Sequence, residues 1–190
     1  MAALPAEETR YSFADALTWG EDERIEIIDG EAYMMAPPVR VHQEISGEVY
    51  RQLANYLIGK KYKVYHAPFA VRLFEENGDR PEDVDTVVQP DLMVVCDHSK
   101  VDRRGVHGAP DMIIEILSDS TRRTDRLTKF NLYQRAGVRE YWIVDPDSHT
   151  VAVHLLQDGQ YGSPDFYAAN ATIPVSILDD CMVDLARVFQ

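Results

Sequence analysis

The sequence of 190 residues contains 45% hydrophobic and 27% charged residues, a balance typical of a soluble globular protein. No window approaches the roughly 18 consecutive apolar residues of a membrane-spanning helix, so we expect no membrane partner. The net charge of -13 counts against loose, non-specific binding to nucleic acid, but it does not exclude an enzyme that cleaves phosphodiesters with bound metal ions. The length favours a single domain over residues 1–190.

The N-terminus and the two cysteines bear on the compartment in which the protein works. Residues 1–10 lack the basic start and the apolar core of a signal peptide, and we expect them to form a flexible arm. Cys96 and Cys181 lie in apolar surroundings far apart in the sequence, which favours free, buried thiols. Free thiols fit a reducing compartment, so the sequence predicts a cytoplasmic protein.

Apolar periodicity and turn residues predict the following elements in chain order: a short helix over 12–19, a hairpin of strands 24–28 and 31–35, a long helix over 41–57, strands over 62–74, 92–96 and 112–117, a helix over 121–136, a strand over 140–144, and a hairpin of strands 151–156 and 161–167. Residues 75–89 are polar and predict a loop or the tip of a hairpin, and residues 97–109 predict a second polar loop. This order favours an α/β (or α+β) fold with a mixed central sheet, an N-terminal hairpin and a C-terminal β-hairpin extension.

Local signals support several of these elements. Ser12 and Asp15 have the spacing of a capping box, and the Asp29-Gly30 pair is a strong signal for a hairpin turn. Pro68 implies a bulge or a sheet edge within the strand over 62–74. The long helix has a single apolar stripe, formed by Val41, Ile45, Val49, Leu53 and Leu57.

One acidic residue, Glu115, lies in the middle of the apolar strand over 112–117. A carboxylate buried there costs free energy unless it is paired or binds a metal. Side chains alternate along a strand, which places Ile113, Glu115 and Leu117 on one face. Asp91 comes just before the strand over 92–96, so the two carboxylates converge if these strands are neighbours. Two close carboxylates either share a proton or hold a hard cation such as Mg²⁺.

A lysine beside such a pair would complete the minimum set for cleaving a phosphodiester, because it can orient water or offset developing charge. Lys129 lies on the helix that follows Glu115, and Asp125 precedes it by four residues. The same spacing is typical of an ordinary Asp–Lys pair on a helix surface. The residues alone leave both interpretations open.

Four groups of residues carry a resemblance to a known family: Glu26…Asp29-Gly30…Met35…Pro38…His42; Pro90-Asp91; Pro110…Glu115-Ile116-Leu117-Ser118; and Asp125…Lys129…Tyr133…Gly137-Val138…Glu140-Tyr141-Trp142-Ile143-Val144-Asp145. The chain resembles, over roughly residues 24–146, the Uma ("Uma two") family of restriction-endonuclease-like proteins, within the PD-(D/E)XK nuclease superfamily. The resemblance implies a core with the order αβββαβ over about residues 38–145.

The resemblance also implies a site. Asp91 and Glu115 would bind Mg²⁺ or Mn²⁺, with the backbone carbonyl of Ile116 as a third ligand. The superfamily usually has its lysine two residues after the acid, where this chain has Leu117. The resemblance therefore places the lysine on the following helix, as Lys129.

Three further residues are candidates for supporting roles. Asp125 would orient Lys129 rather than only pair with it. His42 is either a structural histidine or, as the resemblance implies, a general base or a substrate contact. Glu26 either reaches the site from the hairpin or bonds to Tyr or Arg neighbours.

We expect a metal-dependent endonuclease that hydrolyses DNA phosphodiester bonds. Restriction-endonuclease-like proteins often pair to cut two strands, so we expect a homodimer, with residues 151–189 capping the sheet or forming the interface. Two alternatives stay open: a non-catalytic dimeric binding or regulatory module that keeps the nuclease fold, and a phosphodiesterase or other hydrolase that acts on a smaller substrate. The negative net charge and Leu117 favour the first of them.

Overall fold

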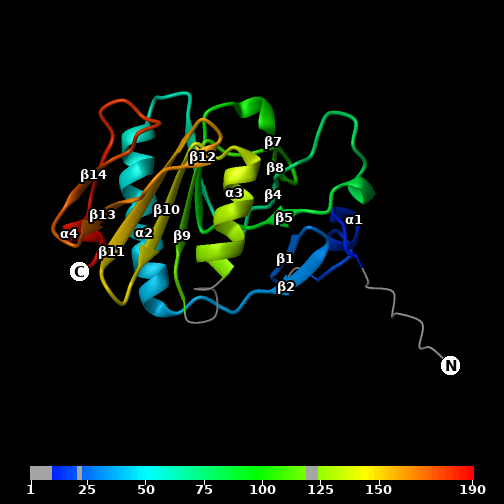
Figure 1. The fold of residues 1–190 in the computed structure, drawn as a ribbon, viewed down its shortest axis with the longest axis horizontal. Helices are drawn as coiled ribbons and strands as arrows, with labels where there is room; N and C mark the ends of the chain where they lie inside the picture. Colours follow the sequence, from blue (N-terminus) through cyan, green and yellow to red (C-terminus); the bar gives the residue numbers. More distant parts are fainter. Residues whose placement is uncertain (1–9, 21–22, 119–123) are drawn as a thin grey trace.

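The structure, a computed structural model, describes residues 10–20, 23–118 and 124–190, and at residues 124–126 it describes the backbone only. Figure 1 shows α2 and α3 on either side of the strands β9 and β10. The helical segments are α1 (Phe13–Ala16), α2 (Arg40–Leu57), the 3-10 turns η1 (Pro81–Asp83) and η2 (His98–Lys100), the π-helical turn η3 (Thr124–Lys129), α3 (Phe130–Ala136) and α4 (Leu185–Val188). Within the described parts of the chain, no helix has both the length and the apolar character that crossing a membrane requires.

Among the described residues, fifteen strands form three sheets. They are β1 (Ile25–Ile28), β2 (Glu31–Met34), β3 (Lys63–His66), β4 (Val71–Arg72), β5 (Val87–Val88), β6 (Leu92–Val95), β7 (Val101–Asp102), β8 (Gly105–His107), β9 (Met112–Ile116), β10 (Glu140–Asp145), β11 (Thr150–Gln157), β12 (Gln160–Tyr161), β13 (Asp165–Ala168), β14 (Thr172–Pro174) and β15 (Met182–Asp184). The large sheet has the order β12-β11-β10-β9-β6-β3, and β13 pairs with β11. The second sheet has the order β2-β1-β5-β4-β8-β7, and β14 pairs with β15.

The large sheet contains the predicted core. In chain order α2, β3, β6, β9, α3 and β10 give the pattern αβββαβ, which confirms the predicted fold class. The strands β9 and β10 are parallel, whereas β9 pairs antiparallel with β6 and β10 pairs antiparallel with β11, so the sheet is mixed as expected. A parallel pair needs a crossover, and η3 and α3 supply it.

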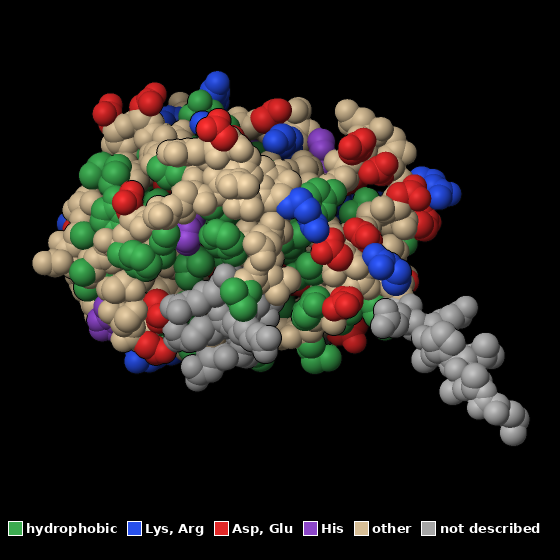
Figure 2. Space-filling model, in the orientation of Figure 1, with side chains coloured by type: hydrophobic (Ala, Val, Ile, Leu, Met, Phe, Trp, Pro, Cys, Tyr) green, Lys and Arg blue, Asp and Glu red, His purple; other side chains and the backbone are tan. Residues whose placement is uncertain are grey.

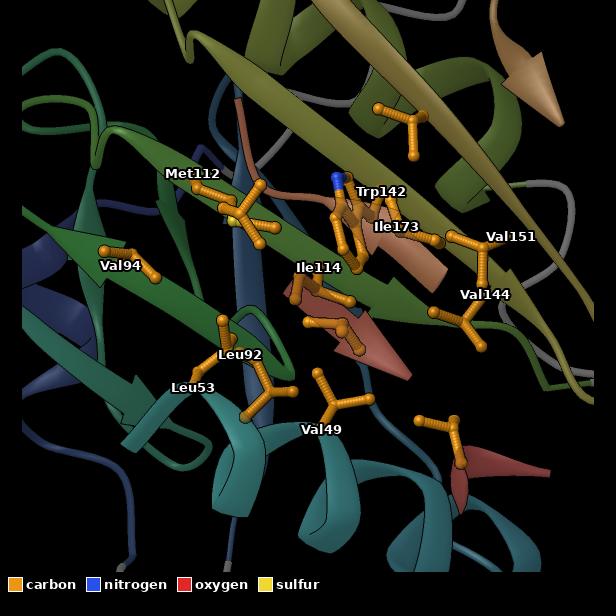
Figure 3. Close-up of a cluster of buried hydrophobic side chains, with 14 of the residues drawn as sticks. Val49, Leu53, Leu92, Val94, Met112, Ile114, Trp142, Val144, Val151 and Ile173 are labelled. Atoms are coloured by element: carbon orange, nitrogen blue, oxygen red, sulfur yellow. The ribbon is translucent and has the colours of Figure 1, made fainter. Parts of the chain in front are cut away.

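Each face of β9 contributes to a different apolar layer. Met112, Ile114 and Ile116 face α2, where Figure 3 shows Val49 and Leu53 directed toward Ile114 and Leu92. The opposite face of β9 carries Ile113, Glu115 and Leu117, as the alternation predicts, and packs against α3. The helix α2 keeps its predicted stripe except at Val41, which lies in the first turn and is 40% exposed.

Only the N-terminal hairpin of the second sheet, β1 and β2, was predicted as such. The strand predicted over 62–74 is wrong: its first part is β3 in the large sheet, and its last part is β4 in the second. The chain changes sheets at Pro68, which has no N–H to donate to a ladder. The stretch predicted as a loop or a hairpin tip leads from β4 into the antiparallel strand β5, which agrees with the hairpin, and the loop predicted over 97–109 contains β7 and β8. Gly105 lies against the Ala70 carbonyl, where a Cβ atom would come within 2.1 Å of the oxygen.

The N-terminal elements largely follow the prediction. The N–H of Ser12 donates to Asp15 Oδ2 at 2.7 Å, as a capping box requires, although α1 ends at Ala16 rather than at Trp19. Positive φ angles at Asp29 and Gly30 (49° and 84°) form the hairpin turn between β1 and β2. Most of the predicted flexible arm, residues 1–9, lies outside the described residues, and Arg10 is anchored by a 2.9 Å hydrogen bond to the carbonyl of Asp29.

The predicted helix over 121–136 begins as a π-helical turn, and the first three of its residues lie outside the described part. Gly137 ends α3 with φ 85°, as expected of a C-cap. The C-terminal hairpin is present, but its second arm is divided into β12 and β13, which both pair with β11. The single-domain assignment for residues 1–190 stays a prediction.

Candidate active site

A pocket of about 610 Å³ opens where α2 begins and β9 ends. Its walls include four of the residues singled out in the sequence: His42, Asp91, Glu115 and Lys129. Three of these side chains carry charge and are largely buried, and buried charges persist only where partners compensate them. The contacts of each residue therefore determine what the pocket can do.

Asp91 precedes β6, which pairs with β9 in a register that sets Leu92 opposite Ile114. The N–H of Ile116 donates to Asp91 Oδ2 at 2.8 Å. In return, the N–H of Asp91 lies 3.5 Å from Glu115 Oε2, a long hydrogen bond. The two carboxylates are thus brought together at the junction of two neighbouring strands, as the sequence predicts.

Glu115 has two partners on the opposite layer. Lys129 Nζ lies 3.0 Å from Glu115 Oε1, and the Tyr133 hydroxyl donates to the same oxygen at 2.6 Å. Lys129 is the last residue of η3, and Tyr133 follows it by one helical turn on α3, so both side chains reach the same carboxylate. Only 3% of each side chain, Lys129 and Glu115, is exposed.

Tyr133 is a hydrogen-bond donor to the site that was not predicted from the sequence. Burial, and next the charge of Glu115, raise the pKa of Tyr133 well above its usual value of 10.0. The hydroxyl therefore keeps its proton and donates to Glu115 at any physiological pH. The signal for this role was the spacing of four residues between Lys129 and Tyr133, which puts both on one side of the helix.

Glu26 on β1 reaches the site from the second sheet. Lys129 Nζ lies 3.0 Å from Glu26 Oε1, and the N–H of Gln89 donates to the same oxygen at 2.8 Å. Of the two interpretations of Glu26, the structure supports contact with the site residue Lys129. The ammonium of Lys129 is therefore shared between carboxylates from the two sheets.

His42 lies in the first turn of α2, with Nε2 3.1 Å from Asp91 Oδ2. Its other ring nitrogen, Nδ1, is buried and has no hydrogen-bond partner among the described residues. The imidazole thus joins Asp91 to the pocket wall.

Two predicted site features are not placed in this way. The side chain of Asp125 lies outside the described residues, so its action on Lys129 stays a prediction. The main-chain N–H of Ile116 bonds to Asp91, while the role of the Ile116 carbonyl as a metal ligand stays a prediction.

The donor set suits a hard divalent cation. Asp91 and Glu115 supply carboxylate oxygens at one wall of the pocket, and oxygen ligands are those that Mg²⁺ and Mn²⁺ prefer. Within the described residues, no three His, Cys, Asp or Glu side chains form a metal-binding group. A cation such as Mg²⁺, which takes one or two carboxylates and otherwise keeps water and substrate oxygens, fits a site of this composition.

Comparisons with known proteins agree with the architecture. The family model Uma2, described as "Putative restriction endonuclease", matches residues 13–185. "Uncharacterized protein slr1290" from Synechocystis sp. (strain ATCC 27184 / PCC 6803 / Kazusa) is 26% identical over 158 residues, which cover 80% of this chain and 78% of the relative. The crystal structure of "a putative nuclease belonging to DUF820" from Anabaena variabilis ATCC 29413 superposes with a TM-score of 0.73 at 19% identity, over 94% of this chain and 97% of that one. The last similarity shows a shared, restriction-endonuclease-like fold.

Proposed function

Because this chain belongs to the Uma2 family, we propose that it is a metal-dependent endonuclease that hydrolyses phosphodiester bonds in DNA. One observation carries the proposal: two carboxylates from neighbouring strands, Asp91 and Glu115, meet at a pocket beside the ammonium of Lys129. This combination of two acids and a lysine is what phosphodiester cleavage requires.

Asp91 and Glu115, with the carbonyl of Ile116, are the groups that would hold Mg²⁺ or Mn²⁺. A bound divalent ion supplies a Lewis acid for the phosphate and lowers the pKa of a water molecule. The buried partners of the two acids orient their carboxylates, which is the arrangement that cation binding needs.

Lys129 is positioned to offset the negative charge that develops on the phosphate during cleavage. Its ammonium is held between Glu26 and Glu115, each at 3.0 Å, which fixes its position beside the pocket. His42 fixes the orientation of Asp91 through the 3.1 Å contact of its Nε2. Side chains from both sheets and from α2 therefore hold the two acids in position.

A second candidate is a phosphodiesterase that acts on a smaller substrate. The volume of about 610 Å³ falls in the range of small-molecule sites, and the acidic chain would repel long duplex more than a short ligand. Cleavage of bis(p-nitrophenyl) phosphate or a short oligonucleotide, without cleavage of plasmid DNA, would favour this candidate.

The proposal includes a homodimer. Two large apolar side chains, Leu127 and Phe166, are 58% and 73% exposed and line a second hollow of about 450 Å³. Figure 2 shows hydrophobic side chains gathered on the face formed by β11, β13 and α3. Exposed apolar surface of this kind is typical of a contact between protein chains.

The activity is tested by incubating the purified protein with supercoiled plasmid, single-stranded DNA and RNA in the presence of Mg²⁺ or Mn²⁺. We expect nicked or linear DNA from the wild type, and at least a hundredfold less from Asp91→Asn and Glu115→Gln. Glu44→Gln is the matched control, because Glu44 is an exposed carboxylate that pairs with Arg40 on α2. Equal cleavage by the wild type and both site variants would contradict the assignment.

A further inference from the structure

We propose that Arg24 binds a phosphate group of the substrate at the wall of the pocket that Asp91 and Glu115 also line. This inference rests on the proposed function, and it gives a polyanionic substrate a cationic contact in a chain of net charge -13. Three observations carry it: the backbone position of Arg24, its lack of a partner and the charge balance of the pocket.

The hairpin fixes the direction of Arg24. The N–H of Met35 donates to the carbonyl of Arg24 at 2.8 Å, which extends the pairing of β1 and β2 beyond Ile25. Side chains two residues apart in an extended chain point to the same face, so the side chains of Arg24 and Glu26 lie on the same face of the hairpin. Glu26 reaches Lys129, and Arg24 lines the pocket that Lys129 also lines.

The guanidinium of Arg24 lacks a partner within the described residues. Its Nε atom is buried and makes no hydrogen bond there, and no described carboxylate forms an ion pair with it. Other arginines of the chain do have acidic partners: Arg40 pairs with Glu44, Arg51 with Glu48 and Arg135 with Asp29. Arg24 is half-buried, and its buried Nε donor without a partner costs free energy that an anionic ligand in the pocket would recover.

The charge balance of the pocket points to the same residue. Of the described residues that line the pocket, Arg24 and Lys129 are those with Lys or Arg side chains. Lys129 lies 3.0 Å from a carboxylate oxygen of both Glu26 and Glu115, whereas no described carboxylate pairs with Arg24. Arg24 is the cation whose charge a bound phosphate would balance. Its planar guanidinium can donate two hydrogen bonds to two oxygens of one phosphate.

The test measures binding of a short fluorescein-labelled DNA oligonucleotide by anisotropy, with Ca²⁺ in place of Mg²⁺, for the wild type, Arg24→Gln and Arg24→Lys. Arg51→Gln is the matched control, because it removes the same charge from an exposed site on α2. We expect Arg24→Gln to weaken binding of the oligonucleotide about tenfold. The slope of the logarithm of the binding constant against the logarithm of salt concentration should fall by about one in magnitude, because one phosphate contact is lost. Arg24→Lys keeps the positive charge but loses the planar guanidinium, so its affinity should lie between those of the wild type and Arg24→Gln. The affinity of Arg51→Gln should stay within about twofold of that of the wild type.

Thermal melting separates binding from a structural role. Since the Arg24 guanidinium has no partner to lose, Arg24→Gln should melt at or above the temperature of the wild type, whereas loss of a structural arginine would lower it. Wild-type affinity in a folded Arg24→Gln, alongside DNA cleavage by the wild type, would overturn the Arg24 assignment alone. Failure of the wild type to bind or cleave any nucleic acid would overturn the proposed function and this inference with it.

Discussion

The ammonium of Lys129 lies 3.0 Å from Oε1 of Glu115, although the two residues are 14 positions apart in the chain. In the usual PD-(D/E)XK signature the lysine follows the acid by two residues on the same strand. Here that position is Leu117, which is buried in an apolar cluster. The helical segment after β9 thus brings a lysine from the neighbouring layer to the same carboxylate.

Replacing Lys129 by methionine should abolish DNA cleavage and lower the stability of the fold. The change leaves Glu26 and Glu115 as buried acids without their shared cation, and such a loss costs about 3–5 kcal/mol. We expect the free energy of unfolding in urea at pH 7 to fall by that amount.

The double variant Glu26→Gln/Lys129→Met serves as the control. It removes one of the two unpaired charges, so it should recover part of the lost stability while cleavage stays absent. Equal unfolding free energies for the wild type and Lys129→Met would contradict the structural role of the shared ammonium.

The long elements of the core could be predicted because their patterns are periodic. The stripe on α2 and the alternation along β9 specify which faces meet, and the Asp29-Gly30 pair specifies its turn. Beyond its hairpin of β1 and β2, the second sheet escaped prediction because β4, β5 and β7 have two residues each, too few for a period. Their pairing is decided by contacts between distant segments, and sequence patterns do not encode such contacts.

Tyr133→Phe tests the hydrogen bond to Glu115. A bond to a charged group contributes about 1.5–3 kcal/mol, so its removal should lower the free energy of unfolding by roughly that amount. Tyr161→Phe is the matched control, because the Tyr161 hydroxyl donates to a neutral acceptor, the carbonyl of Val138, at 2.9 Å. Removing this hydrogen bond in Tyr161→Phe should lower the free energy of unfolding by about 1 kcal/mol. A smaller effect at Tyr133 than at Tyr161 would contradict the proposed anchoring of Glu115.

His154 should make stability depend on pH below neutrality. Burial lowers the pKa of His154 from its usual value of 6.5, and a backbone hydrogen bond with Gly162 opposes this only in part. The unfolded chain therefore takes up the proton more readily, so the contribution of His154 is present above pH 6.5 and is lost as pH falls through the lowered folded pKa.

His154→Phe is the variant that isolates this effect. The imidazole packs against Phe130, Tyr141 and Tyr161, an environment that accepts a phenyl ring. Urea unfolding between pH 7.5 and pH 5 should show a smaller loss of stability in the variant than in the wild type. Parallel curves for the two proteins would mean that His154 keeps its usual pKa.

The exposed apolar side chains make the proposed dimer testable. We expect Phe166→Ser and Leu127→Ser to shift the protein from dimer to monomer in sedimentation velocity at micromolar concentration. Leu17→Ser is the control, since Leu17 is 47% exposed and does not line this hollow. A wild type that sediments as a monomer at all concentrations would contradict the dimer.

The candidate site could be predicted in part. Glu115 was recognisable because an acid inside an apolar strand needs a partner, and Asp91 because it precedes a neighbouring strand. The hydrogen bond of Tyr133 was missed, since a tyrosine on an apolar helix face also reads as core. Arg24 was missed because its significance lies in the partners it lacks, which only the folded chain reveals.

The most direct test of the central claim is anomalous diffraction from crystals of this protein soaked in Mn²⁺. We expect one strong peak about 2.0–2.3 Å from oxygens of both Asp91 and Glu115, with the Ile116 carbonyl as a further ligand, and no such peak in Glu115→Gln. A Mn²⁺ peak that avoids these two carboxylates, or a pocket without a peak at millimolar Mn²⁺, would contradict it.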